Sequence, residues 1–471
     1  MTHLLRTLSA ALSLLPLVAA AQQVSYPVFE EDKIPASQFT ERRQALKSQL
    51  GSNAIAILFT NPERNRNNDC DFRFRADSNF LYLTGFEEPD AALLLVPGGV
   101  QIDGKTVTEV LFVNENDPMS VTWLGYRMGS KDAKTLLGID AVYANTADNF
   151  NKVLKALDST AHPHLYRPSA PPEPSGKVAV MLRQYTDWES QHKDWEQPTG
   201  SLGGMLARQR VKKSAEELTM LRKAATASAM GHREVMRSVQ PGMREYQLQG
   251  IIEYLLTRNG CESVGYNSIV GSGPNSCILH YEEDRRKIQA GDMICMDAAG
   301  EYHGYSADVT RSFPSTGRFT PAQREIYQLV LDAQNAGIAQ CKEGNNFGAP
   351  GRAAEKVITE GLLKLGIIKK PGEMRTYLPH GISHYIGLDV HDAHGDNTLH
   401  SGYVLTVEPG LYIRAGSPCD QKYWNIGVRI EDDILVTSKG PENLSAGAPR
   451  TIAEIESLMK QTGIGKKPVG Q

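Results

Sequence analysis

The residues of this sequence best suited to chemistry are acids set inside apolar runs. Asp297 closes the run "MICMD", Asp308 follows eleven residues later in "YSADVTRSF", and Glu408 and Glu431 interrupt "VLTVEPGLYI" and "IGVRIEDDILV". A buried ionised carboxylate is costly unless a partner compensates its charge. A cap or a nearby arginine such as Arg429 could explain any one of these acids. Four acids placed alike favour a shared cause, which is the binding of cations.

Histidines gather in the segment "LPHGISHYIGLDVHDAHG", residues 378–395, which holds four of the twelve in the chain. Aliphatic residues are mixed with them, and a surface loop would not need those. We therefore expect a core strand whose aliphatic side chains fix it and whose imidazoles line a cleft. Four carboxylates with one histidine form an oxygen-rich ligand set. Such a set suits two cations such as Mn²⁺, Co²⁺ or Fe²⁺ better than a structural zinc site, which would use cysteine.

The elements that must position these residues fall into two groups. In the first half, short apolar runs bounded by turn residues alternate with helical stretches, which predicts an α/β domain. A helix is expected near 40–51. The runs interpreted as buried strands are 54–60, 80–86, 91–97 and 109–114. Region 167–204 is rich in proline, glycine and serine and is interpreted as a linker or an irregular domain edge.

The second half is predicted to contain two helices, strands, two further helices and further strands. Ser214 and Glu217 have capping-box spacing at the start of a long helix, and a second helix ends at Gly260. Pro321, after Thr320, occupies a position that the first turn of a helix tolerates. The order of elements suggests an internal duplication.

Composition and length limit the class of protein. With 471 residues two domains are expected, and a net charge of −4 gives no reason to expect nucleic acid or an anionic membrane as a partner. Residues 1–21 combine Arg6, an apolar run and small residues, which predicts a signal peptide and hence export to the periplasm or the medium. No later run is long and apolar enough to predict a membrane helix. Six cysteines without C-x-x-C spacing argue against a zinc finger.

Five motifs, in order, resemble the metallopeptidase family of aminopeptidase P and prolidase. They are "ILHYEED", "MDAAGEYHGYSADVTRSFP", "LPHGISHYIGLDVHD", "LTVEPGLYI" and "IGVRIEDDILVT". The first half, with "RRQAL", "DSNFLYLTGFEEPDAALLLVP" and "TWLGYRMG", is similar to the N-terminal domain of aminopeptidase P. The resemblance implies an α/β N-terminal domain over 22–205 and an α+β pita-bread catalytic domain over 206–471.

The resemblance also implies roles for single residues. It implies a dinuclear centre, usually of manganese, in which two carboxylates bridge the ions; its ligands would be Asp297, Asp308 (bridging), His384, Glu408 and Glu431 (bridging). Glu408 would also handle a proton. The groups around the substrate would be His280 and His391 as transition-state donors, His380 at a proline pocket, Arg429 orienting the metal-site carboxylates, and Tyr412 near the site. Trp123 matches an aromatic residue that in some relatives reaches a neighbouring subunit's active site, with an ordinary core tryptophan as the alternative. The histidines that match no role are expected at the surface, namely His303, His394 and His400.

The implied activity is release of the N-terminal residue from peptides with proline in the second position, by a homo-oligomer that is a dimer or a tetramer. The alternatives are a prolidase that cleaves Xaa-Pro dipeptides, a methionine aminopeptidase, and a non-catalytic pita-bread binding protein, which would lack ligands. Ser383 favours aminopeptidase P, because prolidases tend to have glycine before the ligand histidine. The segment between His391 and Glu408 is shorter than in similar sequences, and this puts the grip on longer peptides in question.

Overall fold

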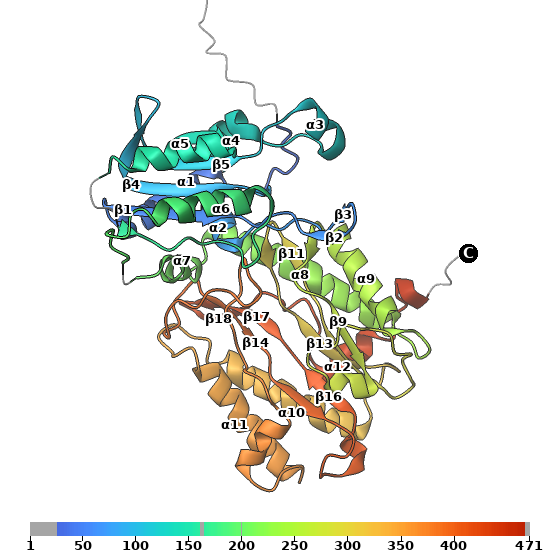
Figure 1. The fold of residues 1–471 in the computed structure, drawn as a ribbon. Coiled ribbons are helices and arrows are strands. Elements are labelled where there is room, and N and C mark those ends of the chain that lie inside the picture. Colours follow the sequence, from blue (N-terminus) through green and yellow to red (C-terminus); the bar gives the residue numbers. More distant parts are fainter. Residues whose placement is uncertain (1–25, 161–163, 199, 467–471) are drawn as a thin grey trace, which may run out of the picture.

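The computed structural model of the protein describes residues 26–160, 164–198 and 200–466. Figure 1 shows two domains in contact, the N-terminal one built around a sheet and the C-terminal one with helices outside its strands. The predicted signal peptide, residues 1–21, lies outside the described residues. Within the described ranges, no helix has the length and apolar character needed to cross a membrane. All six cysteines lie in the described ranges and are free thiols.

The N-terminal domain is built on a five-stranded mixed sheet with the order β6-β5-β4-β1-β7. The central strand β4 pairs antiparallel with β1 and β5, and the edge strands β6 and β7 pair parallel. The strands are β1 Ala54–Phe59, β4 Ala92–Ile102, β5 Lys105–Val113, β6 Ala141–Ala144 and β7 His164–Leu165, with a separate hairpin of β2 Asn65–Asn67 and β3 Cys70–Asp71. Three of the four predicted strands are therefore present.

Side chains of β1 point alternately into two cores, so helices must cover both faces of the sheet. Residues 55, 57 and 59 pack in the core that contains α5 and α6, whereas residues 54, 56 and 58 pack with α1, α2 and α7. The helices of this domain are α1 Ala36–Leu50, α2 Ser78–Thr84, α3 Pro118–Leu124, α4 Gly129–Leu137, α5 Ala147–Leu157, α6 Gly176–Glu189 and α7 Leu202–Arg210. Figure 1 shows the resulting three layers.

The fourth predicted strand, 80–86, is wrong, because this segment lies largely in helix α2. Asp77 accepts a hydrogen bond from the backbone N–H of Phe80 at the start of the helix, and Gly85 ends it in the left-handed conformation, φ 65°. Nearly every residue of α2 is buried, because the helix lies between the sheet and the second domain. An apolar run buried on all sides carries no amphipathic period that would distinguish a helix from a strand.

Region 167–204 is likewise more ordered than the sequence indicated. It contains helix α6 and the start of α7. The buried side chains of α6 are Val178, Met181, Tyr185 and Trp188, whose spacing of three and four residues is that of one helix face. The prolines and glycines lie on either side of this helix. Their abundance is why the sequence predicted a linker.

The C-terminal domain contains the predicted sequence of helix pairs and strands. Helices α8 and α9 pack against each other, as do α10 and α11, and the strands lie between the two pairs (Figure 1). The helices are α8 Ala215–Ser238, α9 Glu245–Arg258, α10 Pro321–Ile338, α11 Ala349–Lys364 and α12 Ile452–Leu458. The strands are β8 Ser263–Val264, β9 Ile269–Ser272, β10 Met293–Asp297, β11 Gly300–Tyr302, β12 Tyr305–Ser306, β13 Thr310–Pro314, β14 Val404–Val407, β15 Gly410–Ile413, β16 Ile426–Arg429, β17 Asp432–Thr437 and β18 Gly440–Asn443.

The histidine-rich segment is not the strand that its aliphatic residues suggested. It contacts β14 through an isolated bridge between Tyr385 and Leu405 and through single backbone hydrogen bonds, such as that from Ile386 to the Val404 carbonyl. The aliphatic residues Ile382, Ile386 and Leu388 are nevertheless buried, as expected. The segment is an irregular chain anchored by side chains, so the positions of its imidazoles depend on what holds it.

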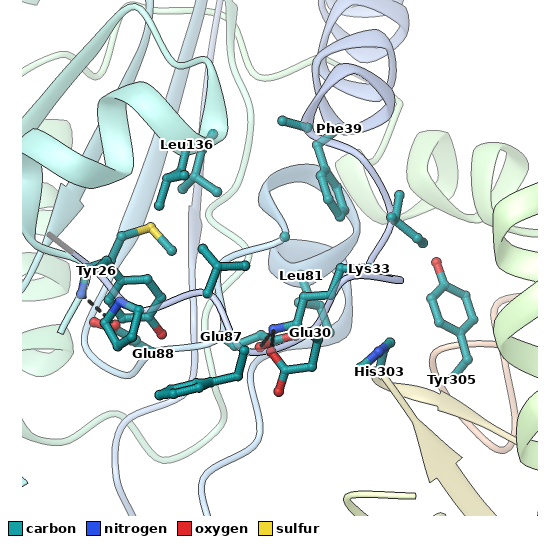
Figure 2. A pocket seen from close by; sticks show the side chains of 18 of the residues that line it. Tyr26, Glu30, Lys33, Phe39, Leu81, Glu87, Glu88, Leu136, His303 and Tyr305 are labelled. Carbon is teal, nitrogen blue, oxygen red and sulfur yellow. Dashed lines mark hydrogen bonds and ion pairs between the residues drawn. The ribbon is translucent and has the colours of Figure 1, made fainter. Parts of the chain in front are cut away.

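A cavity of about 300 Å³ lies at the contact between the domains and not at the carboxylates. Figure 2 shows Tyr26, Phe39 and Leu81 around it on one side and His303 and Tyr305 on the other. None of the predicted metal ligands lines this cavity. It belongs to the seam between the domains and contributes no group to the candidate site.

Candidate metal centre and active site

The four acids lie at the ends of neighbouring strands. Asp297 is the last residue of β10 and pairs with Thr310 at the start of β13, two residues after Asp308. Glu431 lies between β16 and β17, and its N–H donates to the Thr310 carbonyl over 3.1 Å. Glu408 lies between β14 and β15. The strand pairing therefore brings together acids that are up to 134 positions apart in the sequence (431 − 297).

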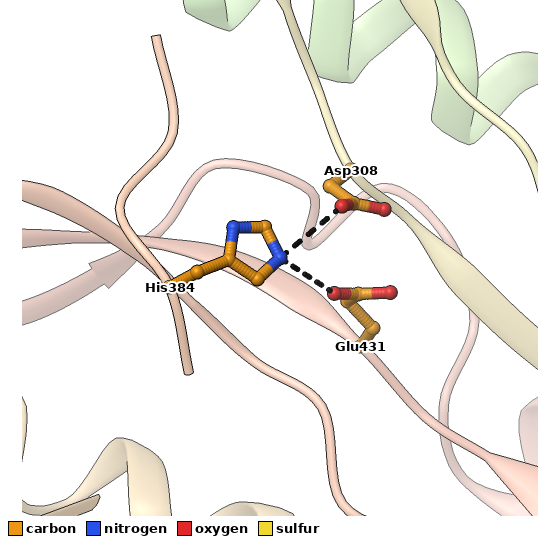
Figure 3. Close-up of side chains that lie close together, drawn as sticks. All are labelled: Asp308, His384 and Glu431. Atoms are coloured by element: carbon orange, nitrogen blue, oxygen red, sulfur yellow. Dashed lines mark ion pairs between the residues drawn. The ribbon is translucent and has the colours of Figure 1, made fainter. Parts of the chain in front are cut away.

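His384 lies among these carboxylates. Its Nε2 lies 3.4 Å from Asp308 Oδ2, 3.6 Å from Glu408 Oε1 and 3.9 Å from Glu431 Oε1. One ligand atom from each of Asp308, His384 and Glu431 fits within 4.8 Å of the others, the spacing of a metal site (Figure 3). The backbone of His384 is anchored to β14, because the Thr406 N–H donates a hydrogen bond to the His384 carbonyl over 2.8 Å.

Asp297 joins the group through two other side chains. The Tyr266 hydroxyl contacts carboxylate oxygens of both Asp297 and Asp308, the latter at 2.7 Å. Arg429 Nη2 donates to Asp297 over 2.7 Å. All five residues predicted as ligands therefore lie at one place in the C-terminal domain. Residues from before α10 and from after α11 both contribute to it.

The electrostatics of this group indicate that positive charge is missing from the protein itself. Burial, with the charges of the neighbouring acids, raises the pKa of Glu431 well above its usual value and that of Glu408 to about 8. Asp308 is the exception, because burial is outweighed by His384, with Tyr266 and Arg429, and its pKa is lowered. Four carboxylates facing Arg429 and one imidazole cannot all ionise without further cations.

The donor set fits divalent cations. Glu431 Oε1 is buried and has no hydrogen-bond partner among the described residues, although Glu431 Oε2 accepts a hydrogen bond from the Thr310 hydroxyl over 2.6 Å. A buried acceptor without a partner is unfavourable unless something fills that position. Carboxylate oxygens with one imidazole suit borderline and hard divalent ions. The residues present are thus able to hold the metal that their chemistry implies.

A line of hydrogen bonds leads from the carboxylates to His380. Arg429, which is buried, donates from Nη1 to the Tyr412 hydroxyl over 2.8 Å, and that hydroxyl lies 2.9 Å from His380 Nε2. Burial, assisted by the charge of Arg429, lowers the pKa of His380 to about 4, so its imidazole is neutral at pH 7. These three residues form one wall beside Glu408, whose Oε2 lies 3.7 Å from His380 Nδ1.

The other two predicted histidines lie at the open side of the site. The His391 ring stacks on His384 with a centroid separation of 4.0 Å and an interplanar angle of 19°. His280 is exposed, and the carbonyl of its neighbour Leu279 accepts a hydrogen bond from Arg429 over 3.4 Å. Both imidazoles could reach a substrate carbonyl without being metal ligands.

Trp123 is not part of this site within one chain. It lies in α3, 78% exposed, which excludes the core tryptophan considered from the sequence. Figure 1 places α3 at the outer end of the N-terminal domain, away from the strands that carry the acids. Its indole Nε1 lies 3.1 Å from Met119 Sδ in the same helix.

Sequence reasoning missed several residues that shape the site. Tyr266 had no signal in the sequence, because its position between two aspartates depends on the pairing of distant strands. Thr310 donates to Glu431, and Asp433 accepts from the backbone N–H of Asp308; each lies two residues after a ligand. That spacing could have identified both. His303, expected at the surface, has a side chain only 8% exposed.

Comparison with known proteins identifies two matching regions in this chain. The model of "Metallopeptidase family M24" matches residues 219–438, and that of "Aminopeptidase P, N-terminal domain" matches residues 39–166. Xaa-Pro aminopeptidases from Escherichia coli and Haemophilus influenzae are 37% and 36% identical over 444 residues, which cover 91% of this chain and 98% of each relative. A zinc-substituted aminopeptidase P from E. coli in complex with product superposes with a TM-score of 0.82 at 36% identity, covering 91% of this chain and 99% of that one.

Proposed function

The chain belongs to metallopeptidase family M24 and is a metal-dependent exopeptidase that removes the N-terminal residue before proline; we propose that two divalent cations, with Mn²⁺ as the expected metal, occupy its centre. The observation that carries the proposal is the convergence of three carboxylates on His384, with Asp297 beside them, while among the described residues Arg429 is the one arginine or lysine that pairs with any of these four acids. One divalent ion would leave the carboxylates partly uncompensated, whereas two balance four acids.

The two oxygens of Asp308 support a bridging role. Oδ1 shares the Tyr266 hydroxyl with Asp297, and Oδ2 faces His384. One carboxylate thus faces both halves of the ligand set. Glu431 Oε1, which also faces His384, is proposed as the second bridge. Asp297, His384 and Glu408 would supply the remaining ligands.

The residues around the cations divide the chemistry among them. When bound, the cations would activate water and stabilise negative charge on the scissile carbonyl. Glu408, 18% exposed at its side chain and flanked by two histidines, accepts the proton of the attacking water and returns it to the leaving nitrogen. His391 and His280 donate to the carbonyl oxygen as charge develops there. His380, Tyr412 and Arg429 form the wall against which the proline ring is held.

The substrate preference is tested with four peptides. An Xaa-Pro-Xaa tripeptide, an Xaa-Pro dipeptide, an Xaa-Ala-Xaa control and an N-acetylated tripeptide are compared by kcat/KM. We expect the free proline tripeptide to exceed the others by about tenfold or more, which corresponds to about 1.4 kcal/mol. A preference for the dipeptide would identify a prolidase. Equal cleavage of the alanine control would remove the proline pocket from the proposal.

We propose that the active form is a homo-oligomer, a dimer or a tetramer, to which the α3 region contributes a contact. Three apolar side chains besides Trp123 are more than 60% exposed there, namely Met119, Leu124 and Tyr126. A group of exposed large apolar residues is typical of an interaction surface. Light scattering of the wild type and of Trp123→Ser tests this, with Phe72→Ser, a matched exposed aromatic outside α3, as control. A monomeric wild type would contradict the proposal.

Export is likewise proposed from residues 1–21. N-terminal sequencing of the protein recovered from a native host should begin near Gln22. Recovery of the chain with Met1 intact would contradict it.

A further inference from the structure

Residues 386–392 form an arm that carries His391 and is held from the N-terminal domain. The arm has no regular secondary structure. Its buried residues Ile386 and Leu388 belong to the same apolar core as Leu81 of α2. The position of His391 therefore depends on contacts between the domains as well as on backbone hydrogen bonds of the arm to β12 and β14, from Ser306 to the Gly387 carbonyl and from Ile386 to the Val404 carbonyl.

A buried group of charges fixes the arm directly beside His391. The side chain of Asp392 is 1% exposed, and it forms an ion pair with Arg210 through one oxygen and with Lys213 Nζ, at 2.9 Å, through the other. The cations are as buried as the acid, with side chains 4% and 1% exposed. A Cβ at Gly387 would lie 2.3 Å from an Asp392 oxygen, so the arm has room for this pair only because position 387 is glycine.

The N-terminal domain holds the other side of Arg210. Arg210 is the last residue of α7, and its Nη1 donates to Asn79 Oδ1 over 2.8 Å. Its Nη2 also reaches Asp389 over 2.7 Å, and Asp389 accepts a further hydrogen bond from the Ser78 hydroxyl, 2.6 Å. Ser78 and Asn79 open helix α2. Arg210 thus connects the start of α2 with both aspartates that flank His391.

Asp392 is buried in the seam while the neighbouring His391 ring lies flat against His384, so a fixed Asp392 fixes the direction of His391. We propose that Arg210, supported by Lys213, is a positioning residue through which the N-terminal domain sets His391 against the candidate metal centre. This inference rests on the proposed function, in which His391 donates a hydrogen bond to the carbonyl of the peptide substrate.

The test is a double-mutant cycle in metal-loaded enzyme. Arg210→Met, His391→Ala and the double variant are assayed with an Xaa-Pro-Xaa tripeptide. We expect Arg210→Met to lower kcat about tenfold or more, with metal content unchanged, since a displacement of about 1 Å of a catalytic group has effects of this size or larger. In the His391→Ala background the same substitution should change kcat by less than about twofold, because the group it positions is absent.

The matched control is Arg43→Met. Arg43 is equally buried in an ion pair with Glu109 but lies wholly within the N-terminal domain. It should lower the melting temperature without changing kcat per folded molecule. Independent costs of Arg210→Met and His391→Ala, or equal kcat in Arg210→Met and Arg43→Met, would overturn the inference. Should Arg210→Met fail to fold, Asp389→Asn, at a half-exposed position of the same network, should show a smaller loss of kcat that is also absent in the His391→Ala background.

A structural measurement separates this inference from the proposed function. In crystal structures of metal-loaded wild type and Arg210→Met, the His391 and His384 rings, whose centroids lie 4.0 Å apart here, should lie further apart in the variant than in the wild type. If the two rings stay stacked in the variant, the positioning role of Arg210 is wrong, even when the wild-type enzyme is fully active and the proposed function holds. An inactive wild type with displaced rings in the variant would instead refute the proposed function alone.

Discussion

Two regions of this molecule bury charge, and they treat it in opposite ways. At the domain seam, Lys213 and Arg210 outweigh the effect of burial and lower the pKa of Asp392 below its usual value. At the candidate metal centre, burial and the neighbouring acids raise the pKa of Glu431 well above the usual value of a glutamate. The seam is compensated by residues of the chain, whereas the centre is compensated only when cations arrive. The first is a structural device, and the second is a binding site.

The largest expected effect comes from removing the cations. Chelation should abolish peptidase activity, and Mn²⁺ should restore it, because no residue of the centre replaces the missing positive charge. Asp308→Asn should lose both ions, since a bridging carboxylate serves each of them. Elemental analysis alongside the activity assay measures both. Full activity in a preparation free of metal would break the distinction between the two regions.

Next in size is the difference between a ligand and a donor histidine. His384→Ala should empty the centre, because its Nε2 faces three of the carboxylates. His391→Ala should keep the metal and lose turnover by about 10²–10³, the usual cost of one transition-state donor. Metal content and kcat are measured on the same samples. Loss of metal from His391→Ala alone would invert the two assignments.

Neutralising one acid in each region should change stability with opposite sign in the chelated protein. Asp392→Asn leaves two buried cations without their main partner and should lower the free energy of unfolding by about 3–5 kcal/mol. Glu431→Gln removes the cost of burying this acid, whose pKa burial and the neighbouring acids raise, and should raise the free energy of unfolding by roughly 1 kcal/mol. Urea unfolding of both variants measures this. Destabilisation of similar size by both would show that the centre is also balanced from within.

The smallest expected effect concerns His303, which lies at the seam. Its Nε2 lies 3.0 Å from Asp32 of the N-terminal segment, and its Nδ1 pairs with Glu262. Although burial opposes it, these carboxylates raise the pKa of His303, while Lys223, Tyr302 and His303 itself lower that of Asp32. The contribution of His303 to stability is therefore complete below its unfolded pKa near 6.5 and is lost as pH rises through its folded value.

The contribution of Asp32 is present above about pH 4 and is lost in stronger acid. The seam should thus be most stable between these limits. Unfolding at pH 6 and pH 9 should show a loss in the wild type that His303→Gln lacks, of at most about 1 kcal/mol because Asp32 is more than one-third exposed. The same pH dependence in both proteins would exclude His303 as its source.

The sequence by itself determined the catalytic chemistry. Acids inside apolar strands are unfavourable unless they bind something, so residue type and pattern were enough to select the four acids, whereas the choice of His384 among the histidines came from the family resemblance. Strands 54–60, 91–97 and 109–114, and the order of helix pairs and strands in the second half, also followed from local periodicity. These features share a physical basis, because each depends on residues close in the chain.

Only the tertiary structure decided what depends on distant contacts. Helix α2 was mistaken for a strand because the second domain buries the face that would otherwise be polar. Tyr266 had no sequence signal, since it contacts two aspartates 31 and 42 positions away. Arg210 and Asp392 are 182 positions apart, and nothing near either residue indicates the other. Periodicity reports which side of a segment is buried, but not what buries it, and the position of His391 depends on that second fact.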